Sequence, residues 1–130
     1  MKKLIFHVGT PKTGTTYIQN ALANNRTELE KQRIGYHKIS GSLSVCHWWF
    51  AASFFDSPMD YAPVKNFVID NNIESLKVIA EKSIEALRVE VQKFDTVILS
   101  AEQYFFLPEL VLERIRDFFT SIDVTVDIKV

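Results

Sequence analysis

The feature that most constrains this chain is a glycine-rich turn between an apolar run and an amphipathic segment. Residues 4–8 are typical of a short buried strand, and the turn from Gly9 to Gly14 contains two glycines, a proline and a lysine. From Thr15 the apolar period becomes that of a helix. A strand, such a turn and a helix, in this order, let backbone N–H groups and a helix N-terminus bind phosphate. The turn therefore predicts a phosphate-binding loop, which we take as the functional centre of the chain.

Beyond the turn, helix-like and strand-like segments alternate. This alternation predicts an α/β fold of three layers, with a mainly parallel sheet flanked by helices, in a single domain over residues 1–130. The expected segments are a helix from Thr15 that ends before Gly35, a strand at 34–39, a helix within 45–55, a loop flanked by Pro58 and Pro63, a helix at 73–94, a strand at 96–100, a helix from Pro108 and a strand at 122–130.

Composition excludes several classes of partner. The formal net charge is -1, so no global basic field favours nucleic acid or an acidic membrane surface. Cys46 is the single cysteine, which makes an intramolecular disulfide impossible and favours a reducing compartment. The N-terminal apolar run ends too early for a signal peptide, and no stretch approaches the roughly 18 apolar residues of a spanning helix. We therefore expect a soluble, cytoplasmic protein.

The order of residues in the turn distinguishes it from a nucleotide-triphosphate loop. That loop has the pattern Gly-x-x-x-x-Gly-Lys-Ser/Thr, and here the two glycines keep its spacing. Lys12, however, lies two places before the second glycine, and Thr15 occupies the usual lysine position. The turn resembles the 5′-phosphosulfate-binding loop of the sulfotransferase superfamily, and residues 7–19 are similar to its bacterial, carbohydrate-type branch. The residues that carry this resemblance are Pro11-Lys12-Thr13-Gly14-Thr15-Thr16.

The resemblance implies a P-loop NTPase-like sheet and 3′-phosphoadenosine-5′-phosphosulfate (PAPS) as the sulfuryl donor. The product would be a sulfate ester or sulfamide, formed without a metal ion. By the family's pattern, Lys12 would contact the phosphosulfate and the bridging oxygen, where an ammonium stabilises the charge that develops on the leaving phosphate. The 5′-phosphate would be held by Thr15 and Thr16 and by the backbone of Thr13 and Gly14. Thr10 and Pro11 complete the donor-binding loop.

Transfer to a hydroxyl or amine, on a carbohydrate for example, also needs a group that accepts the proton. Glu102 follows the predicted strand 96–100, and ligands lie at the carboxyl ends of strands in such sheets. The run 99–104 resembles the family's strand end, where some branches place an acidic residue. His47, which precedes an aromatic run, is the second candidate, although it fits equally a buried histidine with satisfied hydrogen bonds. The aromatic run itself is typical of either core or an acceptor surface.

The resemblance covers the N-terminal portion of the family. The arginine and serine that bind the donor's 3′-phosphate would follow Val130, so we expect an apparently truncated domain with weak donor binding and little turnover. The final strand could then associate copies of the chain through its edge. Two alternatives remain: a P-loop nucleotide kinase and a non-catalytic binding or assembly module. The kinase is disfavoured because no lysine follows Gly14 and because the strand 96–100 ends in Ser100, not in an acidic magnesium ligand.

Overall fold

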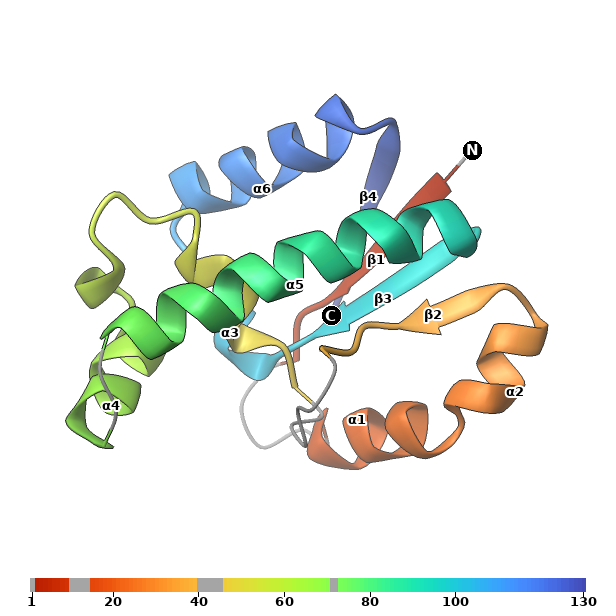
Figure 1. Cartoon of the computed structure of the whole chain (residues 1–130), viewed down its shortest axis with the longest axis horizontal. Helices are drawn as coiled ribbons and strands as arrows, with labels where there is room; N and C mark the ends of the chain where they lie inside the picture. The colour runs from red at the N-terminus through yellow and green to blue at the C-terminus, as the bar shows by residue number, and fades with distance from the viewer. Residues whose placement is uncertain (1, 10–14, 40–45, 71–72) are drawn as a thin grey trace.

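A four-stranded sheet, in which all strands run parallel, forms the centre of the protein (Figure 1). The computed structural model describes residues 2–9, 15–39, 46–70 and 73–130. The strand order is β2-β3-β1-β4, so β1 is central and β4 lies at an edge. The predicted α/β class with a mainly parallel sheet flanked by helices is confirmed. The strands are β1 (Lys2–His7), β2 (Ile34–Tyr36), β3 (Thr96–Ser100) and β4 (Val124–Lys129).

The connections between the strands distribute the helices over both faces of the sheet. The β1–β2 connection runs one way along the sheet, and the two later connections run the other way. Because parallel crossovers are right-handed, α1 and α2 lie on one face and α5 and α6 on the other (Figure 1). The helices are α1 (Thr15–Asn24), α2 (Arg26–Lys31), α3 (Trp48–Ala52), α4 (Ala62–Asp70), α5 (Ile73–Lys93) and α6 (Glu109–Ser121), with short 3-10 helices η1 (Pro58–Asp60) and η2 (Glu102–Phe106).

The main hydrophobic core lies between the sheet and the pair α5 and α6. Side chains alternate along each strand, so the apolar residues at every second position face these helices. Phe6 lines a small cavity with Leu112 and Ile115 of α6. Its ring stacks on that of Tyr104, with the two ring centroids 4.3 Å apart. The fully buried side chains of this core include Leu4, Phe6, Phe50, Leu87, Val97, Leu99, Tyr104, Ile115 and Phe119.

The predicted helix from Thr15 ends before Gly35, as expected, but it is interrupted. Asn25 separates α1 from α2, and α2 ends at Lys31. The left-handed residue that closes this segment is Arg33, with φ 61°. Gly35 lies within β2, where a Cβ atom would overlap the Phe94 ring. Glycine is needed here because a larger residue would clash with the Phe94 side chain, and not because a helix ends at this position.

Two segments differ from the expectations between residues 45 and 63. The predicted loop flanked by prolines contains η1 and the start of α4. Pro63 lies in the first turn of α4, where N–H groups have no intrahelical acceptor, so its missing N–H costs little. The helix expected within 45–55 is confined to α3, with Trp49 and Phe50 buried in the core. None of the helices in the described part of the chain could cross a membrane.

Candidate functional site

The carboxyl ends of β1 and β3 lie side by side, at the edge where open parallel sheets bind ligands. His7 is the register partner of Ser100, so the two strands end at the same level. The Ala101 N–H donates to the His7 carbonyl at 3.3 Å, and the Val8 N–H donates to the Lys129 carbonyl at 2.7 Å. The chain therefore leaves β1 at the centre of this edge, directly before the predicted phosphate loop.

The loop residues themselves fall mostly outside the described part of the chain. This holds for Thr10, Pro11, Lys12, Thr13 and Gly14, so their predicted contacts with a donor stay predictions. The segments on both sides are described, because β1 ends at His7 and α1 begins at Thr15. Thr16 is exposed in the first turn of α1. The turn is thus flanked by the strand and the helix that a phosphate loop requires.

A small polar network joins the strand before the loop to the helix after it. His7 Nδ1 lies 2.7 Å from Ser100 Oγ, and Gln19 Nε2 of α1 donates to the same hydroxyl at 3.2 Å. Gln19 is buried, and burial lowers the pKa of His7, which favours its neutral form. Ser100 can therefore accept from Gln19 and donate to His7. The network holds β1, β3 and α1 together at the site.

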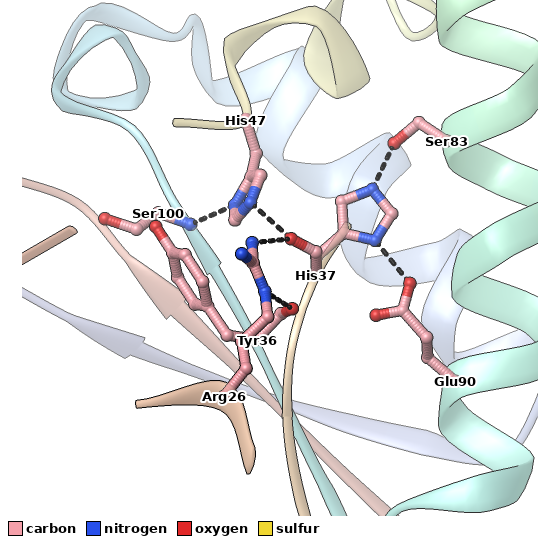
Figure 2. A network of polar contacts seen from close by, with 7 residues as sticks. All are labelled: Arg26, Tyr36, His37, His47, Ser83, Glu90 and Ser100. Carbon is pink, nitrogen blue, oxygen red and sulfur yellow. Dashed lines mark hydrogen bonds and ion pairs between the residues drawn. The ribbon is translucent and has the colours of Figure 1, made fainter. Parts of the chain in front are cut away.

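His47, the second candidate base, lies buried behind this edge with both ring nitrogens in hydrogen bonds (Figure 2). Its Nε2 contacts the carbonyl oxygen of His37 at 2.8 Å, and the Ser100 N–H donates to its Nδ1 at 2.9 Å. The Tyr104 hydroxyl donates to the His47 carbonyl. Burial, and then the neighbouring His37, hold the pKa of His47 well below its usual value. The ring is therefore a neutral donor–acceptor bridge, and in this arrangement neither nitrogen can take a proton from a substrate.

A second buried arrangement, which was not predicted from the sequence, is centred on His37 (Figure 2). Its Nδ1–H donates to Glu90 Oε1 at 2.6 Å, and its Nε2 lies 2.7 Å from Ser83 Oγ. Ser83 and Glu90 are two turns apart on α5, and His37 follows β2 directly. His37 is distant in the sequence from Ser83 and Glu90, which lie seven residues apart on one face of α5.

This Ser–His–Glu order matches the order of groups in a hydrolase triad, but its surroundings do not suit that chemistry. His37 and Ser83 are both 0% exposed, so a substrate carbonyl cannot reach the hydroxyl. Arg26 closes the same region by donating to the carbonyls of Tyr36 and His37, both at 3.1 Å. We interpret these contacts as the polar anchor between α5, β2 and α2.

Glu102, the other candidate base, lies in η2 just beyond the end of β3. Its side chain is half-buried and lines an open pocket of about 650 Å³. One aromatic residue from the predicted run, Phe55, lies in this wall, whereas Trp49 and Phe50 belong to the core. The other lining residues are Asp60, Tyr61, Ala62, Pro63, Asn66, Gln103, Phe106 and Pro108.

Comparisons with protein-family models, curated proteins and solved structures found no match to this chain. Within residues 2–9, 15–39, 46–70 and 73–130, no cluster of three His, Cys, Asp or Glu side chains is placed to hold a metal ion. The features that could bind a ligand are the turn after β1, the strand edge around it and the pocket beside Glu102.

Proposed function

We propose that this chain has a P-loop-like, sulfotransferase-type site that binds PAPS at the turn between β1 and α1. The observation that carries the proposal is the position of the sequence Pro11-Lys12-Thr13-Gly14-Thr15-Thr16. It follows the central strand of a parallel sheet and runs into a helix that begins at Thr15. Backbone N–H groups at such a junction bind anions, and Lys12 adds the charge that suits a phosphosulfate.

The proposed reaction transfers a sulfuryl group to a hydroxyl or amine. The acceptor oxygen or nitrogen forms a bond to sulfur as the bond from sulfur to the bridging phosphate oxygen breaks. Lys12 stabilises the negative charge that this oxygen gains. Glu102 accepts the proton that the acceptor loses, because it follows the strand adjacent to β1 and faces a pocket open to solvent. His47 positions the end of β3 through Ser100 instead of acting as the base.

Calorimetric titration tests the donor site without requiring turnover. We expect 3′,5′-adenosine bisphosphate to bind more tightly than ATP with magnesium. Preference for ATP would favour a nucleotide kinase instead, and the absence of binding to either would favour a non-catalytic module. Lys12→Ala should abolish bisphosphate binding.

Lys82→Ala is the matched control, since it removes an exposed lysine from α5, on the opposite face of the sheet. It should leave bisphosphate binding unchanged. Equal binding by wild type and Lys12→Ala would contradict the role of Lys12. An equal loss of bisphosphate binding in Lys12→Ala and Lys82→Ala would show a general effect of net charge, not a specific contact of Lys12.

A further inference from the structure

We propose that the pocket beside Glu102 binds an organic cation: a protonated amine carried on an aromatic or similarly flat apolar body. The pocket is formed by η1 and the start of α4, which follow each other in the chain, and by η2, which lies about forty residues later. Its volume of about 650 Å³ lies within the range of small-molecule sites. Its wall combines negative charge, hydrogen-bond acceptors and aromatic rings.

The charged side chains that line the pocket are all negative. Asp60 and Glu102 both line the pocket, and its described lining includes no lysine, arginine or histidine. Neither carboxylate forms an ion pair with another residue in the described part of the chain. Two carboxylates without a neighbouring cation create a negative potential in the pocket. This potential attracts a positively charged ligand and repels an anion.

The hydrogen-bonding groups of the wall also favour a ligand that donates hydrogen bonds. The carboxylates of Asp60 and Glu102 both belong to the wall. An ionised carboxylate accepts hydrogen bonds and donates none. An ammonium group supplies three N–H donors and no acceptor, so it complements these groups better than a hydroxyl or a carboxylate does.

Aromatic rings provide the apolar part of the pocket. Phe55 and Tyr61 stack with their centroids 4.8 Å apart and their planes at 16°. The Tyr61 hydroxyl donates to the Trp48 carbonyl at 3.3 Å, which fixes the orientation of its ring. Phe106, 70% exposed, adds a third ring to the wall. Flat rings beside carboxylates bind cations through both the ring face and the charge, and they also cover an apolar body.

The same features separate this pocket from the donor site. A phosphosulfate donor carries several negative charges and would be repelled by Asp60 and Glu102. After the bound ammonium loses one proton to Glu102, its nitrogen has the lone pair that a sulfuryl acceptor needs; this assignment alone rests on the proposed function. The prediction that the pocket binds amines does not depend on it, because it follows from the pocket's own residues.

Ligand-observed NMR titration at pH 7 tests the inference with three probes that share one ring: tyramine, 2-(4-hydroxyphenyl)ethanol and 3-(4-hydroxyphenyl)propionate. We expect tyramine to bind at least about tenfold more tightly than the alcohol, and the propionate not to bind. Asp60→Asn and Glu102→Gln should each weaken tyramine binding by about three- to tenfold. Glu85→Gln, which removes an exposed carboxylate from α5, should leave it unchanged.

The inference would be overturned if all three probes bound similarly, if the propionate bound more tightly than tyramine, or if tyramine did not bind at millimolar concentration. It would also be overturned if Glu85→Gln weakened tyramine binding as much as Asp60→Asn and Glu102→Gln do. The titrations contain no nucleotide, so their outcome is independent of the donor test. Tyramine binding without bisphosphate binding would contradict only the sulfotransferase proposal, and the reverse would contradict only the amine pocket.

Discussion

The two faces of the sheet are built from the same four strands but differ in chemistry. On the face towards α5 and α6, Leu4, Phe6, Val97 and Leu99 are almost fully buried in a continuous apolar core. On the face towards α1, Ile5 and Ile98 are only half-buried, and the contact with the helix is made through the His7–Ser100–Gln19 network. Alternation along β1 and β3 thus separates an apolar surface from a polar one.

This difference separates the source of stability from the location of the site. Apolar burial on the α5 and α6 face supplies the larger stabilising contribution and does not require the turn after β1 to adopt a particular shape. The polar face holds α1 next to that turn through a few hydrogen bonds. An α/β sheet can therefore hold a binding loop between a tightly packed helix layer and a lightly packed one. Substitutions in the two layers should change the free energy of unfolding by different amounts.

The largest predicted effect comes from truncation on the apolar face. Phe6→Ala should lower the free energy of unfolding by about 3–5 kcal/mol, because it removes a fully buried ring that stacks on Tyr104. The matched change on the other face, Ile5→Ala, should cost less than half as much. Urea denaturation followed by circular dichroism measures both. Equal losses would show that the two layers contribute alike.

Ser100→Ala tests the polar face directly. It leaves the buried amide of Gln19 without its acceptor and His7 without its partner, which should cost about 1–3 kcal/mol. Amide hydrogen exchange in α1 should accelerate more than exchange in α5. Ser121→Ala removes an exposed hydroxyl bonded to Phe118 and should change stability by no more than about 0.5 kcal/mol. Unchanged exchange in α1 would contradict the anchoring role of Ser100.

Acidification should destabilise the protein through His7 and His47. Burial lowers the pKa of both from the model-peptide value of 6.5, so below that pH the unfolded chain binds protons that the folded protein excludes. Their contribution is fully present above pH 6.5 and is lost as pH falls towards the folded pKa values. Each histidine contributes a slope of up to about 1.4 kcal/mol per pH unit. Unfolding free energies that stay flat or rise between pH 7 and 5.5 would contradict this account.

The smallest effect is expected at an exposed ion pair. Lys31 lies 3.0 Å from Glu28 on α2, with both side chains about two thirds exposed. Lys31→Ala should change the free energy of unfolding by at most about 0.5 kcal/mol, since such a pair is solvated and screened. Thermal unfolding at low and high salt measures it. A loss as large as that in Ser100→Ala would mean that α2 depends on this pair.

The elements with a clear apolar period were predictable from the sequence. The expected helix 73–94 corresponds to α5, and the expected strand 96–100 to β3. In contrast, α4 was missed because its proline lies in the first helical turn, where a proline is tolerated. The expectation that the first helical segment ends before Gly35 is confirmed, since α2 ends at Lys31. Gly35 is not its stop signal, however, because the close approach of the Phe94 ring requires that glycine within β2.

The candidate site was predictable only where it is local in sequence. The turn between β1 and α1 is a continuous motif, and its flanking strand and helix are observed. The contacts of His37 with Ser83 and Glu90 join the end of β2 to α5, two elements that are far apart in the sequence, so no continuous motif could reveal them. The pocket beside Glu102 likewise depends on α4 and η2, which were not expected as helices.

The most direct test of the account is to map the response of backbone amides to 3′,5′-adenosine bisphosphate by NMR. We predict that the largest shift changes will occur at the carboxyl edge of the sheet, among Val8, Gly9, Thr15, Thr16 and Ala101. The amides of α5 and α6 should remain unchanged. A response centred on α5 and α6, or no response at a bisphosphate concentration in the millimolar range, would contradict a phosphate site between β1 and α1.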